Sequence, residues 1–186
     1  MASLAFIAAY LLLIFAPLPD RGAAAVAALW GPLLAVASFG LGKLLEVPRR
    51  SSLVQLGVLF NLLASALVTA MLLVQIAVGM KAQGKLSPEL VAIWLGLDVA
   101  WDVYIGCGTL LLACAMFGHP RFRWPFGAAG VLAVAVLLVL NLATFPTPPG
   151  EAGLFDAGPV VALWYLAVTI QMLRSLAWVK GQAPAG

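Results

Sequence analysis

The sequence predicts an all-α fold: a polytopic integral membrane bundle of six transmembrane helices, with both termini in the cytoplasm. Composition is the first observation behind this prediction. Hydrophobic residues make up 64% of the 186-residue chain and charged residues only 9%, whereas soluble domains carry about 25% charged residues. The second observation is that apolar stretches alternate with short charged or Pro/Gly-rich breaks. The third is an unequal division of Lys and Arg between those breaks.

The apolar stretches predict the helices in order. The first has no Lys or Arg before it and no clear cleavage site, so it is interpreted as a retained helix rather than a signal peptide. It is short for a hydrocarbon core about 30 Å thick. The second contains Trp30, Gly31 and Pro32, where a kink is expected. We expect one domain over residues 1–186, with helices at about 3–18, 23–45, 52–79, 88–117, 125–144 and 159–178.

Two of these predicted helices begin with recognisable capping chemistry. In the fourth, Ser87 can cap the helix, Pro88 suits its first position, and Glu89 suits the positive end of the helix dipole. In the sixth, Pro159 takes the same position behind Asp156. These signals predict helices with defined starting points.

The distribution of basic residues predicts the orientation, because short loops rich in Lys and Arg stay in the cytoplasm. Seven basic residues flank one side of the predicted bundle and three flank the other, which places both termini in the cytoplasm. This asymmetry also accounts for the small net charge of +3, so no nucleic-acid partner is inferred. The first side holds Lys43, Arg49, Arg50, Arg121, Arg123, Arg174 and Lys180, and the second holds Arg21, Lys81 and Lys85.

Two carboxylates in the fourth predicted helix are the strongest indication of function. Asp98 and Asp102 lie four residues apart and therefore share one helix face. An ionised Asp at the centre of a membrane helix costs about 2.5–3.5 kcal/mol on insertion scales. Because no Lys or Arg is expected at that depth, either at least one carboxyl is protonated or the pair holds a cation or an amine.

Other polar and aromatic residues are expected to lie near this pair. Ionisable groups inside a membrane protein are functional by default, whereas Asn, Ser and Thr often only hydrogen-bond helices together. Both interpretations stay open for the polar residues, and the aromatic residues could cage an amine or serve as packing anchors. The candidate ligand-binding residues are Asp98, Asp102, Asn61, Ser65, Thr69, Asn141, Tyr165, Trp94 and Trp101.

Two further segments are interpreted from their composition. The stretch 145–158 is rich in Pro and Gly and carries apolar anchors, which fits either a stiff lid over the outer mouth or a rigid connector. His119 is the only histidine and is interpreted as a loop residue. No metal site and no cofactor are predicted, since the chain lacks a His pair, a phosphate-binding Gly loop and hydrolase motifs.

From about residue 52 to 144 the chain resembles a bacterial family of small, uncharacterised multi-pass membrane proteins that share a domain of unknown function. The resemblance lies in an Asp early in a helix, the stretch "YIGCGTLLLA", the loop "HPRF" and the helix "FGAAGVLAVAVLL". It implies a bacterial protein of six or more helices, and hence the inner membrane, and it transfers no catalytic residue.

Three functions are compatible with these residues. The first is a bundle that binds or transports a proton, a cation or a small amine at Asp98 and Asp102, open to the outer side. The second is a structural or accessory membrane subunit whose aspartates are protonated and hydrogen-bonded. The third, less favoured, is a membrane enzyme on a lipid-soluble substrate that uses the carboxyls as acid and base. The expected partners are the lipid bilayer and the small ligand, with homo-oligomerisation left open.

Overall fold

The computed structural model describes residues 2–15, 20–47, 49–82, 87–143 and 158–182. In these ranges the regular structure is helical throughout, which confirms the all-α prediction. The described ranges hold seven helices: α1 (Ala2–Phe15), α2 (Asp20–Leu45), α3 (Ser52–Ala82), α4 (Pro88–Met116), α5 (Arg123–Leu142), α6 (Gly158–Arg174) and α7 (Leu176–Gln182). The predicted lid at 145–158 falls almost wholly outside the described residues.

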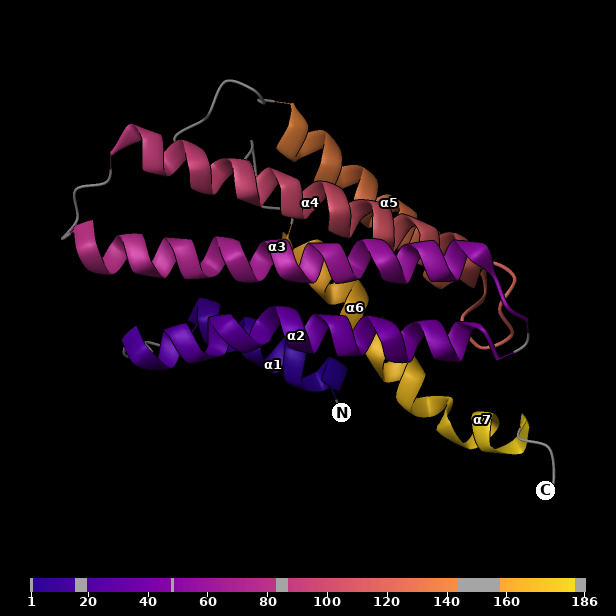
Figure 1. Cartoon of the computed structure of the whole chain (residues 1–186). Coiled ribbons are helices and arrows are strands. Elements are labelled where there is room, and N and C mark those ends of the chain that lie inside the picture. The colour runs from indigo at the N-terminus through magenta and orange to yellow at the C-terminus, as the bar shows by residue number, and fades with distance from the viewer. Residues whose placement is uncertain (1, 16–19, 48, 83–86, 144–157, 183–186) are drawn as a thin grey trace.

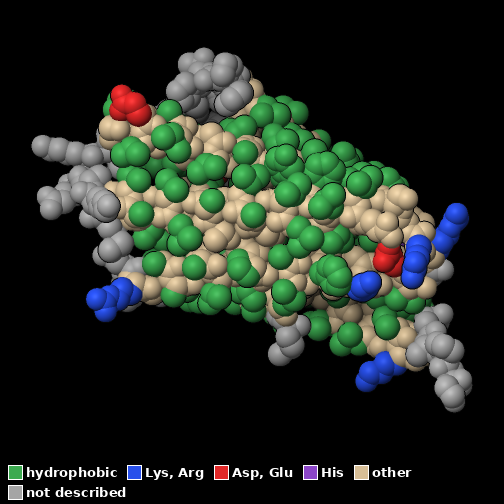
Figure 2. All heavy atoms as spheres, viewed as in Figure 1, with side chains coloured by type: hydrophobic (Ala, Val, Ile, Leu, Met, Phe, Trp, Pro, Cys, Tyr) green, Lys and Arg blue, Asp and Glu red, His purple; other side chains and the backbone are tan. Residues whose placement is uncertain are grey.

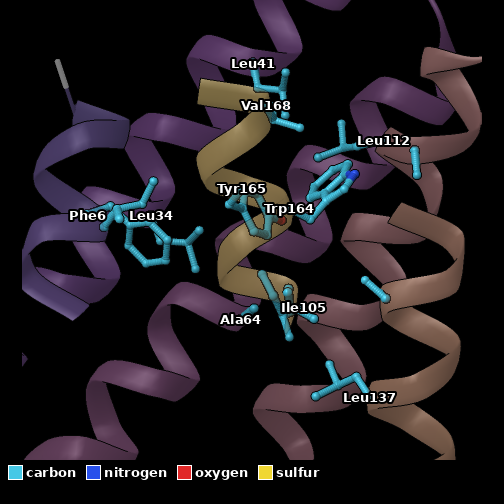
Figure 3. Packing of buried hydrophobic residues seen from close by; sticks show 14 of the residues in the cluster. Phe6, Leu34, Leu41, Ala64, Ile105, Leu112, Leu137, Trp164, Tyr165 and Val168 are labelled. Atoms are coloured by element: carbon cyan, nitrogen blue, oxygen red, sulfur yellow. The ribbon is translucent and has the colours of Figure 1, made fainter. Parts of the chain in front are cut away.

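The helices form a bundle in which α3 lies between α2 and α4 along most of its length (Figure 1). Helix α5 packs on the other side of α4, and α1 packs on α2. Helix α6 contacts both α5 and α1, so the last long helix connects the two flanks of the bundle. The core therefore lies where α6 meets α2, α3 and α4, around Tyr165, Leu34 and Ile105 (Figure 3).

Within the described part of the chain, four helices are long and apolar enough to cross a membrane: α2, α3, α4 and α5. Helix α1 has 14 residues and α6 has 17, which at 1.5 Å per residue gives about 21 Å and 26 Å. Large apolar side chains face outward on the bundle, including Leu132, Val139 and Leu163, each about two-thirds exposed. Charged side chains gather at the two ends in Figure 2. This surface is that of an integral membrane protein.

The sixth predicted helix ends earlier than the sequence suggested. We expected one helix over 159–178, but α6 stops at Arg174 and α7 starts at Leu176. Ser175 accounts for the break. Its amide donates to the carbonyl of Met172, a tighter turn than an α-helix, and its hydroxyl donates to the carbonyl of Gln171 at 2.7 Å. The Arg174 carbonyl accepts from the Arg121 guanidinium instead of continuing the helix.

Glycines set the closest helix contacts. A Cβ atom at Gly31 on α2 would collide with the Ser65 carbonyl oxygen and the Thr69 hydroxyl on α3. On α4, a Cβ at Gly108 would collide with the Asn61 side chain, and one at Gly106 would lie 3.1 Å from Leu138. Small residues in membrane helices allow this approach of one backbone to another.

Candidate functional site

One face of α4 carries the functional candidates. Asp98, Asp102 and Thr109 recur at helical spacing on it, together with the buried Ile105. Asp98 is half-buried, whereas Asp102 is only 5% exposed. Asp102 stands at the midpoint of α4, about 21 Å from either end. A carboxyl group is therefore held at the greatest distance from water that this helix offers.

Asn141 meets Asp102 from the neighbouring helix. It is 8% exposed and closes the buried stripe of α5 that includes Gly130 and Leu137. Its amide nitrogen Nδ2 donates a hydrogen bond to Asp102 Oδ2. The antiparallel packing of α4 and α5 explains why Asp102 meets Asn141. One turn after Asp102, Gly106 packs on Leu138, which lies one turn before Asn141. We call Asp98, Asp102 and Asn141 the aspartate site.

The oxygen of the Asn141 side-chain amide accepts no hydrogen bond from the described residues. This atom, Oδ1, is buried. A buried carbonyl oxygen without a donor costs about 1–3 kcal/mol. The side-chain amide of Asn141 thus contacts a carboxylate through its nitrogen, while its neutral oxygen stays unsatisfied.

Aromatic rings pack α4 against the first two helices. Trp101, adjacent to Asp102 in sequence, lies with its ring centroid 5.7 Å from that of Trp30 on α2. Trp30 in turn stacks on Phe6 of α1, with centroids 5.4 Å apart. Trp94 is half-buried on α4, two turns from Trp101. Trp101 therefore belongs to a packed aromatic row.

A second polar cluster lies nearer the C-terminal end of α4, and it joins four helices. The Asn61 amide nitrogen donates to the Tyr165 hydroxyl at 2.8 Å and to the Ser38 hydroxyl at 3.0 Å. The Tyr165 and Thr109 hydroxyls are hydrogen-bonded at 2.9 Å. Asn61 and Thr109 are fully buried. We call Ser38, Asn61, Thr109 and Tyr165 the brace, because each residue comes from a different helix.

Two more predicted site residues form hydrogen bonds to the backbone of their own helix. The Ser65 hydroxyl donates to the Asn61 carbonyl at 2.7 Å, and the Thr69 hydroxyl donates to the Ser65 carbonyl at 2.9 Å. Thr169 on α6 does the same toward the Tyr165 carbonyl. Such bonds satisfy a hydroxyl buried in an apolar bundle without an interhelical partner.

The predicted single site is thus divided into two clusters. Asp102 and Asn141 are in contact, and Asn61 and Tyr165 are in contact, but they belong to the aspartate site and the brace respectively. Ser38 and Thr109 were not predicted from the sequence. A signal for Thr109 was available, since it follows Asp98 and Asp102 on the same helix face, eleven and seven residues later.

The aspartate site suits hard, oxygen-preferring ligands. Among the described residues, no group of three or more His, Cys, Asp or Glu side chains could hold a metal ion. The groups present are two carboxylates and an amide oxygen, which bind alkali cations or the N–H donors of an amine.

Comparison of the chain with models of protein families, with curated proteins and with solved structures finds no match in any of the three. The resemblance drawn from residues 52–144 stays a prediction.

Proposed function

We propose that the protein binds a small cation, either an alkali ion or a protonated amine, at the aspartate site. One observation carries the proposal: the buried Asn141 Oδ1, which has no hydrogen-bond partner among the described residues, belongs to the amide that contacts Asp102. A bound cation would supply the positive charge that a carboxylate needs at this depth and the donor or Lewis acid that the amide oxygen needs.

The arrangement favours a cation over an anion or a neutral ligand. Asp98 and Asp102 supply the negative charge one helical turn apart. Trp101 lies after Asp98 and directly before Asp102 in the sequence, and the face of an indole attracts an ammonium group. Protons compete for the same carboxylates, so we expect ligand affinity to fall as the pH is lowered.

The test is a melting scan in detergent of the wild type, Asp102→Asn and Asp98→Asn, across a panel of alkali chlorides, small amines and pH values. A ligand present at a hundredfold excess over its dissociation constant stabilises the wild type by about 2.7 kcal/mol. We expect Asp102→Asn to abolish this stabilisation while it melts at or above the wild-type temperature without ligand, because a buried charge is removed.

Glu89→Gln is the matched control for this scan. Glu89 is an exposed carboxylate in the first turn of the same helix, outside the aspartate site. Its substitution removes the same charge and should leave the ligand response intact. If no panel member shifts the wild type and both Asn variants melt like it, cation binding is refuted in favour of a structural role.

The structural alternative has its own support in the brace. Hydrogen bonds from Asn61 and Tyr165 join α2, α3, α4 and α6 without a ligand. A membrane subunit that serves only as scaffold would need such contacts and no more. Asn61 Oδ1 in the brace likewise has no hydrogen-bond partner among the described residues. What distinguishes the aspartate site is that its amide contacts a buried carboxylate, which a scaffold would not need, and this is why cation binding is the preferred function.

We further propose six spans, with α1 and α6 crossing together with the four long helices, in a bacterial inner membrane with both termini cytoplasmic. Labelling two ends of α4 tests the orientation. In a Cys107→Ala/Cys114→Ala background, a cysteine at Glu89 should react with an impermeant maleimide added to intact cells. A cysteine at Gly118, which is exposed and where a Cβ atom would have no neighbour within 4 Å, should react only after lysis. The reverse pattern would invert the orientation.

A further inference from the structure

A hollow lined by two arginines lies at the opposite end of α4 from Glu89. It has a volume of about 420 Å³ and sits where the α2–α3 connection passes the end of α4. Arg49 and Arg50 are among the residues that line it, and both are exposed. No carboxylate is among the lining residues, all of which are described. We call this hollow the arginine pocket.

The start of α3 adds backbone donors to the same pocket. Ser51 and Ser52 line it, and the Ser51 carbonyl accepts the amide of Gln55, which marks Ser51 as the cap of α3. The amide N–H groups of the first helical turn have no acceptor within the helix, and the helix dipole makes this end positive. Two arginine residues and the first residues of a helix therefore line one hollow.

His119 forms a fixed wall of the pocket. Its Nδ1 accepts the Arg121 amide at 3.2 Å, and its ring lies 5.3 Å from Phe122 and 5.6 Å from Trp178, centroid to centroid. Burial lowers the pKa of His119 and the Arg121 charge lowers it further, with the Leu44 carbonyl opposing both. The imidazole is neutral at pH 7, so the positive charge in the pocket is that of the arginines.

The remaining lining has an apolar character. Leu45 and Val54 are buried at the floor, and Ala115 is half-buried. A charged mouth above an apolar floor, at the end of an apolar bundle, is where a lipid headgroup lies. Arg121 is not a lining residue, because its guanidinium donates to Ser175 Oγ and to the Arg174 carbonyl.

We propose that the arginine pocket binds a phosphate group, carried by the headgroup of an anionic phospholipid or free in solution. Guanidinium groups bind phosphate through paired N–H donors, and the amides at the start of a helix add further donors. The site is separate from the aspartate site, and its occupancy does not depend on cation binding there.

The test measures binding of two probes to the full chain in detergent. The first is dihexanoyl phosphatidylglycerol, with dihexanoylglycerol, which lacks the phosphate, as the control, and the second is inorganic phosphate. Arg49→Gln/Arg50→Gln should weaken phosphatidylglycerol binding at least about tenfold, since each charge-assisted hydrogen bond lost costs about a factor of ten. Arg174→Gln removes an exposed arginine outside the pocket and should change it less than about twofold.

The two probes distinguish the sources of the phosphate. Binding of phosphatidylglycerol alone identifies a lipid site, and binding of both probes identifies a site for any phosphate; either supports the proposal if the double variant loses it. Arg49→Lys/Arg50→Lys keeps the charge but not the paired donors. If the Gln variant does not fold, an affinity of the Lys variant for phosphatidylglycerol below that of the wild type supports the proposal, and an unchanged affinity contradicts it. No binding by either probe, equal binding of dihexanoylglycerol, or an equal loss in Arg174→Gln would overturn the proposal.

Discussion

Gly31→Ala should lower the melting temperature of the protein by about 6–12 °C, the largest effect that we expect from any single substitution here. A Cβ at this position collides with the Ser65 carbonyl oxygen, which is backbone and cannot rotate away, as well as with the Thr69 hydroxyl. Helices α2 and α3 would have to separate. Overpacking of this kind costs about 3 kcal/mol, and each kcal/mol shifts the melting temperature by about 2–4 °C in a chain of this size.

Gly40→Ala is the matched control on the same helix. A Cβ there meets only the end of the Met172 side chain, at 3.8 Å, which is ordinary van der Waals contact. Alanine is the better helix former, so this variant should melt at or slightly above the wild-type temperature. If Gly31→Ala melts within about 2 °C of the wild type, the close contact of α2 with α3 does not hold the bundle together as described.

Tyr165→Phe should lower the melting temperature by about 2–8 °C, the second largest effect. The ring that packs against Phe6 and Trp164 is retained, but the hydroxyl that bonds Asn61 and Thr109 is lost. Interhelical hydrogen bonds in membrane proteins contribute about 0.6 kcal/mol each on average. Two of them fail together here, which gives a loss of about 1–2 kcal/mol.

Thr169→Val removes a hydroxyl from the same helix, one turn away. Because that hydroxyl donates only to the Tyr165 carbonyl of its own helix, the variant should melt within about 1 °C of the wild type. Equal losses in the two variants would mean that the Tyr165 hydroxyl contributes through desolvation alone and that the brace does not join the helices.

The helices were predictable because their signal is local. Apolar length and the Ser87–Pro88 cap placed α4 to within a residue of its observed bounds, and the Ser87 hydroxyl accepts the Leu90 amide as expected. The contact of Asp102 with Asn141 could not be derived in the same way. It depends on the register of α4 against α5, and glycines at the interface set that register. The spacing of residues within a single helix carries no information about how two helices are aligned.

The brace and the break at Ser175 were missed for related reasons. Ser38 is a lone hydroxyl in an apolar helix, and only the approach of Asn61 from 23 residues away gives it a role. At the end of α6, the contacts of Ser175 are joined by Arg121, which lies 53 residues earlier and donates to the Arg174 carbonyl. His119 lies in the loop between α4 and α5, as predicted. The sequence did not show that it accepts the Arg121 amide or that it lines the arginine pocket.

The long separation within the brace constrains how the protein is made. Asn61 and Tyr165 are 104 residues apart in the chain, so a ribosome that adds about 5–20 residues per second delivers the tyrosine about 5–20 seconds after the asparagine. During that interval α3 and α4 must reside in the insertion machinery or the bilayer with the Asn61 amide short of one acceptor. Assembly of the early helices is therefore provisional, and the arrival of α6 completes it.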